Sequence, residues 1–183
     1  VLADNAQMLP IEVPVPDQAT IGGILASGLY GPRRLGSGTL RDYMIGIEVA
    51  YSDGSVAKAG GMVVKNVSGF DLMRMHNGAL GTLGVIVSAN FKVLPKPRTE
   101  KTVTAHFETR EDFAHFWSDM SKMIPGLVSA ELQYADPGWS ASWRIEGRPG
   151  SVDSAVERLR QRLPGGHDLL EPEQSVSFWQ AYI

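Results

Sequence analysis

Alternating and helically spaced hydrophobic residues organise the second half of the chain. Apolar and polar residues alternate over 101–107, which predicts a strand. Thr109 stands before acidic residues and then aromatic residues at helical spacing, so it predicts the start of a helix, which Pro125-Gly126 ends. Two more alternating runs, 127–134 and 140–146, flank a Pro-Gly turn and predict a hairpin.

The residues after this hairpin predict a second helix. Ser151 is a suitable capping residue for it, and Gly165-Gly166 stops it. The apolar positions expected to face inward are Val152, Ala155, Val156, Leu159 and Leu163. The order strand–helix–strand–strand–helix is typical of a ferredoxin-like sandwich, which one more strand would complete. We therefore predict a partial ferredoxin-like α+β region whose aromatic residues form a core rather than a cofactor site.

Strands and glycine-rich loops dominate the first half. The ranges 45–51 and 55–59 predict two strands joined by a turn, and 70–76 predicts a helix of about two turns. A long strand is predicted over 85–93, with one face formed by Val85, Val87, Ala89, Phe91 and Val93. This half is therefore expected to be α+β, with a mostly antiparallel sheet and short helices.

Composition places these elements in one large domain or two small ones. The 183 residues are 43% hydrophobic and 20% charged, as in folded globular proteins. Most of the 20 glycines precede Pro97 and all four tryptophans follow it, so we expect domains at 1–97 and 98–183. Both ends of the chain read like the interior of a folded protein, so we expect a truncated fragment of a longer chain.

Charge and residue types exclude several functions. A net charge of −3 offers no basic field for a nucleic acid, and no apolar run reaches the roughly 20 residues of a membrane span. The chain has no Cys, which excludes thiolate nucleophiles and iron–sulfur clusters held by this chain. The four His lack metal-ligand spacing, so no metal site is predicted. Arg33-Arg34 is interpreted as a solvated face, and the chain as cytoplasmic.

Three glycine-rich clusters are the candidate chemistry of this sequence. They lie at 19–31, 36–42 and 78–86. Glycine permits close backbone approach, and successive N–H groups can bind an anion. A helix that starts at Ile21 would also direct its amide dipoles at a phosphate. The alternative is that these glycines only form tight turns between strands. The dinucleotide, P-loop and nucleophile-elbow glycine motifs do not occur in the context that they require.

Taken in order, four segments resemble a known family. They are ATIGG (19–23), GSGTLRDYMIGIEVAYSDG (36–54), KNVSGFDL (65–72) and GALGTLGVIVSANFKVLPKP (78–97). Together they resemble the FAD-binding domain of the vanillyl-alcohol-oxidase/PCMH-type FAD-linked oxidases. GPRR (31–34) and KNVSGFD point within that family to the FAD-binding subunits of glycolate oxidase. The resemblance implies the second subdomain of a PCMH-type domain over 1–97, with the first subdomain missing, and a partial cap or substrate region over 98–183.

The resemblance also implies which residues contact the cofactor. The segment through ATIGG would lie along the pyrophosphate and flavin, and the G-T-L-G segment would pack its backbone against FAD. The implied cofactor-binding residues are Pro16, Thr20, Ile21, Gly22, Gly23, Ser27, Gly28, Gly31, Gly81, Thr82, Leu83, Gly84, Val85 and Ile86. Arg41-Asp42 match an R-D pair that is expected to be structural. The FAD would be non-covalent, because the first 75 residues contain no His.

The implied activity is the oxidation of a small 2-hydroxy acid, of glycolate or D-lactate type, by an FAD-dependent oxidoreductase. Electrons would pass to other flavoprotein and iron–sulfur subunits, which could also hold the protein at the inner membrane. The catalytic residues are unknown, and Arg41, Lys65 and Arg74 are candidate carboxylate anchors. Two alternatives remain open: a non-catalytic assembly module whose aromatic-rich second half docks a partner subunit, and a related flavin reductase of the same fold.

The absence of the first subdomain is expected to lower the affinity of this chain for FAD. Ordering FAD costs several kcal/mol, and each 1.4 kcal/mol of lost interaction weakens binding about tenfold. Because part of the pyrophosphate donors would be absent, we predict that this chain alone binds FAD weakly or not at all.

Overall fold

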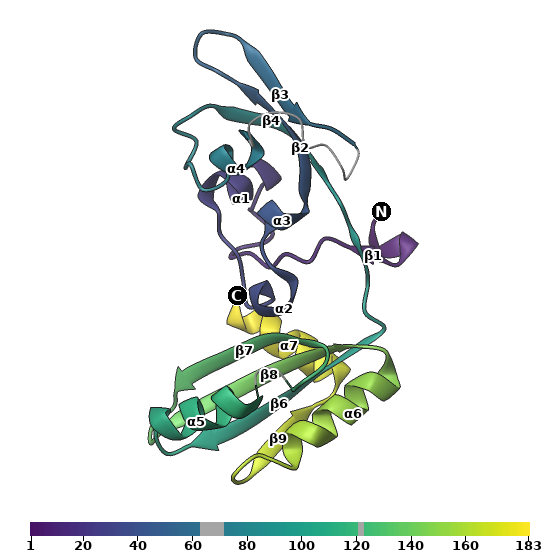
Figure 1. Ribbon diagram of the computed structural model, residues 1–183, viewed down its shortest axis with the longest axis vertical. Helices are drawn as coiled ribbons and strands as arrows, with labels where there is room; N and C mark the ends of the chain where they lie inside the picture. Colours follow the sequence, from purple (N-terminus) through teal and green to yellow (C-terminus); the bar gives the residue numbers. More distant parts are fainter. Residues whose placement is uncertain (63–71, 121–122) are drawn as a thin grey trace. The chain divides into compact units, whose positions relative to one another are not determined.

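The computed structural model describes residues 1–62, 72–120 and 123–183 and divides the chain into two compact units (Figure 1). The first unit comprises Val1–Gly31 and Gly38–Lys96, and the second comprises Pro32–Ser37 and Pro97–Ile183. Residues 32–37 are predicted to belong to the first part. The structure places this segment in the second unit, because the backbone of Gly36 lies directly against that of Val128.

A three-stranded antiparallel sheet, ordered β3-β2-β4, forms the centre of the first unit. The strands are β2 (Met44–Ala50), β3 (Val56–Gly60) and β4 (Val85–Phe91). Their positions agree with the predicted strands, and the central strand β2 contributes the buried side chains of Ile47 and Val49. The core of this unit is built from small and medium aliphatic residues: Val13, Ile24, Leu25, Leu40, Met44, Ile47 and Val49.

Short helices and a small second ladder complete the first unit. The helices are α1 (Ile21–Ser27), α3 (Leu40–Tyr43) and α4 (Leu72–His76), with a 3-10 turn η1 (Ala3–Asn5) near the start. Strand β1 (Gln7–Met8) pairs with β5 (Leu94–Pro95). The start of α1 at Ile21 is as predicted. Most of KNVSGFDL, including Lys65, lies outside the described residues, as does the start of the helix predicted over 70–76.

The inward face of β4 differs from the prediction. Val85 and Val87 are 68% and 59% exposed, while other residues of this strand pack against the core. The register explains the reversal: Glu48 pairs with Ser88 but Val49 pairs with Ile86, which leaves Val87 as an extra residue in a β-bulge. A one-residue insertion exchanges the two faces of a strand, so the residues that pack inward are Ile86, Ala89 and Phe91.

The second unit is a four-stranded antiparallel sheet, ordered β7-β8-β6-β9. Its strands are β6 (Thr99–Phe107), β7 (Leu127–Tyr134), β8 (Trp139–Gly147) and β9 (His167–Leu170). Helices α5 (Arg110–Met120) and α6 (Pro149–Arg160) complete the ferredoxin-like order, and β9 is the strand that the sequence pattern lacked. Helix α6 begins at Pro149 rather than at Ser151, because proline is favoured at the first helical position.

An aromatic cluster fills the face of this sheet that helices α5 and α6 cover. The ring of Trp143 lies 5.4 Å from Phe116 and 6.3 Å from both Phe107 and Phe113, measured between centroids. Trp143 is fully buried together with Val103. This confirms the prediction that the helically spaced aromatic residues form a core.

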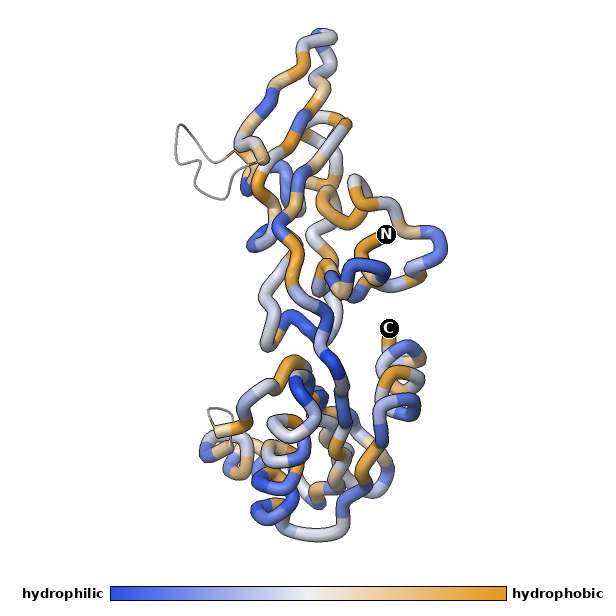
Figure 2. Tube along the Cα trace, turned by 90° about the vertical axis from the view of Figure 1, so that its right-hand side faces the viewer, coloured by the Kyte–Doolittle hydropathy of each residue, from blue (hydrophilic) through white to orange (hydrophobic). Residues whose placement is uncertain are grey.

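The opposite face of the same sheet carries polar side chains. Because neighbouring residues of a strand point to opposite faces, Thr102 points away from the cluster that holds Val103. Helix α7 (Pro172–Tyr182) covers this face through Trp179, whose Nε1 donates to Thr102 Oγ1 at 2.8 Å. Hydrophobic and hydrophilic residues alternate along this C-terminal helix (Figure 2). The short helix α2 (Arg34–Ser37) packs against β7.

Candidate functional site

A crevice in the first unit brings together two of the three glycine-rich clusters. It has a volume of about 330 Å³. Its walls are the start of α1, the loop after α4 and the start of β4. The lining residues are Thr20, Gly22, Gly23, Ala26, His76, Ala79, Gly81, Gly84, Val85 and Ile86. Small residues and exposed backbone therefore form most of its surface.

Local hydrogen bonds fix the two walls of this crevice. Thr20 caps α1, since its hydroxyl accepts from the N–H of Gly23 at 3.1 Å. The loop after α4 is tied to the end of α1 by two backbone bonds, from Gly78 N to Leu25 O and from Leu80 N to Ala26 O, at 2.9 and 2.7 Å. The crevice is thus held by the backbone, and its shape does not depend on long flexible side chains.

The fold requires glycine at one position that lines the crevice and does not require it at another. Gly84 is required by the fold, because its φ is +155° and a methyl group there would lie 2.6 Å from Val49 Cγ1. Gly22 has no such reason. A methyl group at Gly22 would lie 3.7 Å from the nearest atom, the carbonyl oxygen of Ile86, and alanine favours a helix over glycine by about 1 kcal/mol. The open space beside Gly22 fits a flat ligand that approaches the backbone closely.

One buried titratable side chain reaches the crevice. His76, the last residue of α4, is 2% exposed, and its Nε2 lies 3.3 Å from the hydroxyl of Tyr51. The Tyr51 ring also borders the crevice wall, since a methyl group at Gly84 would lie 3.2 Å from its Cδ1. Sequence reasoning missed both residues, because neither belongs to a glycine cluster and a single His carries no spacing signal.

Seven of the residues predicted to contact the cofactor line this crevice, and seven do not. The seven outside it are Pro16, Ile21, Ser27, Gly28, Gly31, Thr82 and Leu83. Two of them have clear local roles: Gly28 ends α1 with a φ of +66°, and Gly31 lets the chain pass close to the backbone of Glu12. The Ser27 hydroxyl donates to Ile24 O at 3.2 Å within its own helix. Contact of any of these residues with a cofactor, whether they line the crevice or not, stays a prediction.

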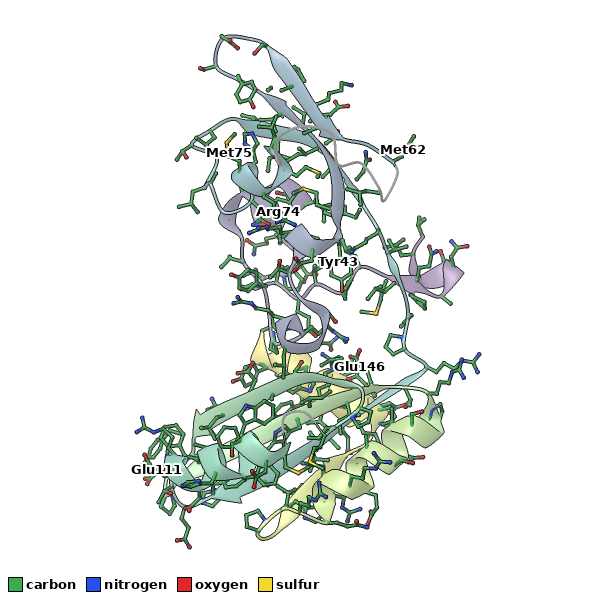
Figure 3. The ribbon with its side chains drawn as sticks, viewed as in Figure 1. Tyr43, Met62, Arg74, Met75, Glu111 and Glu146 are labelled. Atoms are coloured by element: carbon green, nitrogen blue, oxygen red, sulfur yellow. The ribbon has the colours of Figure 1, made fainter. Side chains whose placement is uncertain are left out.

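The second glycine cluster has structural roles and does not line the crevice. Gly38 has a φ of +77°, and a methyl group there would lie 2.8 Å from a carboxylate oxygen of Asp42. The Asp42 carboxylate accepts from the Thr39 backbone at 2.7 Å and from the Thr39 hydroxyl at 2.9 Å. These bonds, the backbone bond first, hold the pKa of Asp42 below its usual value. Arg41 is exposed on α3, and neither Arg41 nor Arg74 is among the residues that line the crevice. Arg74 is exposed on α4 (Figure 3).

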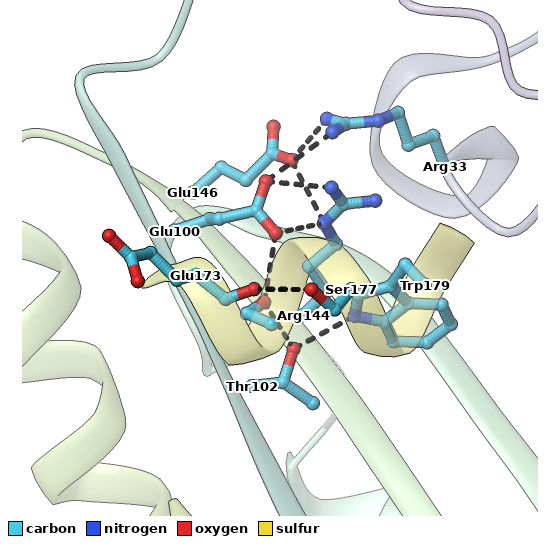
Figure 4. Close-up of polar contacts among 9 residues, drawn as sticks. Arg33, Glu100, Thr102, Arg144, Glu146, Glu173, Ser177 and Trp179 are labelled. Carbon is cyan, nitrogen blue, oxygen red and sulfur yellow. Dashed lines mark hydrogen bonds and ion pairs between the residues drawn. The ribbon is translucent and has the colours of Figure 1, made fainter. Parts of the chain in front are cut away.

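Arg33 is buried, contrary to the prediction of a solvated face. Its side chain is 11% exposed and forms ion pairs with Glu146 and Glu100, which both also pair with Arg144 (Figure 4). Arg144 binds Glu100 through two bonds of 3.0 and 2.7 Å. Burial raises the pKa of Glu146, and the two arginines oppose that shift.

The polar network continues from these charges to α7. The Ser175 hydroxyl donates to Glu100 Oε1 at 2.8 Å and lies 2.7 Å from Thr102 Oγ1. The four charges balance, and the Ser175 hydroxyl gives Glu100 a further hydrogen bond, so this network is a structural element of the second unit rather than a free charged site.

Metal and membrane sites are not found in the described part of the chain. Over 1–62, 72–120 and 123–183, no three His, Asp or Glu residues lie close enough to hold a metal ion. Within the same ranges, no helix has both the length and the apolar character needed to cross a membrane.

The comparisons with known proteins define the class first. Residues 1–60 match the family described as FAD binding domain. They include the Thr20–Gly23 wall of the crevice, so the crevice lies partly within the stretch that matches an FAD-binding domain. Two curated relatives are then glycolate oxidase subunits. GlcE of Escherichia coli (strain K12) is 37% identical over 183 residues, which is 98% of this chain. GlcD of Bacillus subtilis (strain 168) is 40% identical over 120 residues, or 64% of this chain. The chain is therefore similar to glycolate oxidase subunits, and its residues 1–60 match an FAD-binding domain.

Solved structures agree on the fold. A chitooligosaccharide oxidase has a TM-score of 0.71 at 20% identity and covers 97% of this chain and 38% of its own length. An alkyldihydroxyacetonephosphate synthase has a TM-score of 0.71 at 16% identity, covering 93% and 36%. The chain spans 47% of GlcE and 25% of GlcD, so it corresponds to half or less of the curated relatives that it matches.

Proposed function

We propose that this chain supplies one wall of the FAD site of an oxidoreductase that oxidises a small 2-hydroxy acid. The observation that carries the proposal is the crevice in which Thr20–Gly23 and Gly81–Ile86 meet, with unexplained open space at Gly22. The substrate class is supported by relatives named glycolate oxidase subunit and D-lactate dehydrogenase.

The chain's own residues would bind and orient the cofactor rather than carry out the chemistry. FAD supplies the two-electron oxidation when it is bound. Backbone at Gly22, Gly23 and Gly81 would lie against the cofactor, and Thr20 would keep the helix start in place. Arg41, Lys65 and Arg74 remain candidate carboxylate anchors.

Partner subunits and location belong to the same proposal. The relatives GlcE and GlcD are named as subunits, which supports a multisubunit complex in which electrons pass to other flavoprotein and iron–sulfur subunits. We propose a cytoplasmic complex, held at the inner membrane only through those partners. The aromatic residues give the assembly-module alternative little support, because Trp143 and Trp179 are 0% and 1% exposed and lie in the core.

The test exchanges Gly22 for leucine in the flavoprotein that carries this chain. A leucine side chain would enter the crevice and weaken FAD binding by about ten- to hundredfold, since overpacking costs about 1–3 kcal/mol. The matched control is Gly150→Leu, because Gly150 is also the second residue of a helix and has nothing within 4 Å of its missing methyl group. FAD fluorescence titration of the apoprotein gives the dissociation constants. Equal FAD affinity for Gly22→Leu and wild type would contradict the proposal.

The prediction for the isolated chain is tested separately. The 183-residue chain alone is expected to bind FAD weakly or not at all, because this chain would supply only part of the FAD site. Titration with FAD, followed by flavin fluorescence, measures this, and submicromolar binding would show that the prediction is wrong.

A further inference from the structure

A buried imidazole presents one unpaired ring nitrogen to the crevice. Nε2 of His76 faces the Tyr51 hydroxyl, and Nδ1 has no hydrogen-bond partner in the described part of the chain. Nδ1 is not enclosed either, since the enclosed unpaired side-chain atoms over the described residues are Ser129 Oγ and Trp143 Nε1. His76 lines the crevice and is 98% covered, so the small accessible part of its ring opens there.

The Tyr51 hydroxyl determines which hydrogen His76 offers. The phenol proton of Tyr51 can be donated to His76 Nε2, which lies 3.3 Å from the hydroxyl oxygen. In that arrangement Nδ1 carries the ring hydrogen, because a neutral imidazole has one donor and one acceptor nitrogen. The doubly protonated ring also has a hydrogen on Nδ1. In both of these forms the crevice meets an N–H donor at this point.

We propose that His76 donates a hydrogen bond from Nδ1 to an acceptor oxygen of the bound flavin nucleotide, and that Tyr51 positions the imidazole. The inference rests on the proposed FAD site. The ligand class is an oxygen acceptor, which FAD offers in its diphosphate and in the carbonyl groups of its ring system. The surrounding wall is apolar side chain and glycine backbone, so a donor without a partner there would lose a hydrogen bond that water supplies in the open crevice.

Paired substitutions test this role in apoprotein prepared from the flavoprotein that carries this chain. His76→Phe keeps a flat ring without the donor and is expected to weaken FAD binding about tenfold. His76→Asn keeps an N–H near the position of Nδ1 and is expected to bind within about threefold of wild type. Tyr51→Phe removes the hydroxyl that orients the ring and is expected to give an intermediate loss. Tyr182→Phe is the control, since it removes a hydroxyl bonded to Glu131 in the other unit.

Two probes locate the acceptor oxygen. ADP carries the diphosphate without the flavin ring, and riboflavin carries the ring without any phosphate. A loss in His76→Phe that appears with ADP assigns a phosphate oxygen, and a loss that appears with riboflavin assigns a ring carbonyl. In addition, the ¹⁵N resonance of His76 Nδ1 is expected to shift on FAD addition in wild type and to stay unshifted with a ligand that lacks that oxygen.

The outcomes separate this inference from the proposed function. If Gly22→Leu weakens FAD binding while His76→Phe and Tyr51→Phe bind like wild type, the crevice holds FAD and the His76 role is wrong. If neither Gly22 nor His76 substitutions change FAD binding, the proposed site itself is wrong, and the inference fails with it. If His76→Phe does not fold, Tyr51→Phe and the ¹⁵N shift decide the question.

Discussion

The two units use their large hydrophobic side chains in opposite ways. In the second unit, Trp143 and Leu159 are fully enclosed around one sheet. In the first unit, Leu80, Val85 and Val87 are 73%, 68% and 59% exposed, and small residues occupy the crevice. Both units have a core of their own, but the first unit leaves more of the large apolar side chains beside its sheet and crevice exposed.

The largest expected effect on the free energy of unfolding comes from a substitution in the aromatic core of the second unit. Trp143→Ala removes a fully buried ring that contacts Phe116 and is expected to lower the free energy of unfolding by about 3–5 kcal/mol. Leu80→Ala, in the first unit, is expected to change it by less than about 0.5 kcal/mol, because Leu80 is exposed. Urea unfolding measures both variants, and similar losses would break the comparison.

Neighbouring arginines give the next test. Arg33→Ala is expected to lower the free energy of unfolding by about 3 kcal/mol, because it leaves two buried carboxylates with Arg144 alone. Arg34→Ala is the matched control, and it is expected to lose at most about 1 kcal/mol because Arg34 is exposed. Thermal and urea unfolding give the values. An Arg33→Ala variant as stable as Arg34→Ala would show that the buried network adds nothing to the second unit.

Two crevice glycines sharpen the comparison inside the first unit. Gly84→Ala is expected to lower the free energy of unfolding by about 1–3 kcal/mol, since the new methyl group meets Val49 and the backbone is left-handed. Gly22→Ala is expected to leave stability unchanged or raise it by up to about 1 kcal/mol. Unfolding of the apoprotein in urea checks both. A destabilised Gly22→Ala variant would remove the argument that its open space serves a ligand.

The smallest expected effect depends on pH. The pKa of Asp42 is lowered in the folded state, so its contribution to stability is present above about pH 4 and is lost as the pH falls through the folded-state pKa. Wild type is therefore expected to unfold at a higher temperature than Asp42→Asn at pH 7, and the difference is expected to shrink toward pH 3. A difference that grows on acidification would mean that Asp42 does not act through its ionised form.

Strands and helices with regular patterns were predictable, and their irregularities were not. The alternation in β6 and β7 marks both strands because each has one face against the core. In β4 the alternation continues through Val87, but pairing with β2 inserts a bulge that the pattern of a single strand cannot show. Helix α7 was missed because its buried face packs onto polar side chains such as Thr102, which gives no apolar stripe of ordinary width.

The candidate site was predictable where local backbone chemistry defines it. Thr20 and the glycines after it predict a capped helix, and the 78–86 cluster predicts a glycine-rich loop, which lines the same crevice. Arg33 and His76 were not predictable in the same way, because their burial arises from partners far away in sequence: Glu146 for Arg33 and Tyr51 for His76. A dipeptide such as Arg33-Arg34 has the same local pattern whether or not a distant strand supplies a carboxylate.

The short segment Pro32–Ser37 has a consequence for recombination between relatives. It belongs to the second unit although the rest of that unit is encoded from Pro97 onward. In a chimera that exchanges only 97–183, the sheet of the second unit therefore comes from one parent, whereas Arg33 and Gly36 come from the other. Exchanges that carry 32–37 along with 97–183 keep both inherited partners together and should yield soluble hybrids more often than exchanges at Pro97 alone.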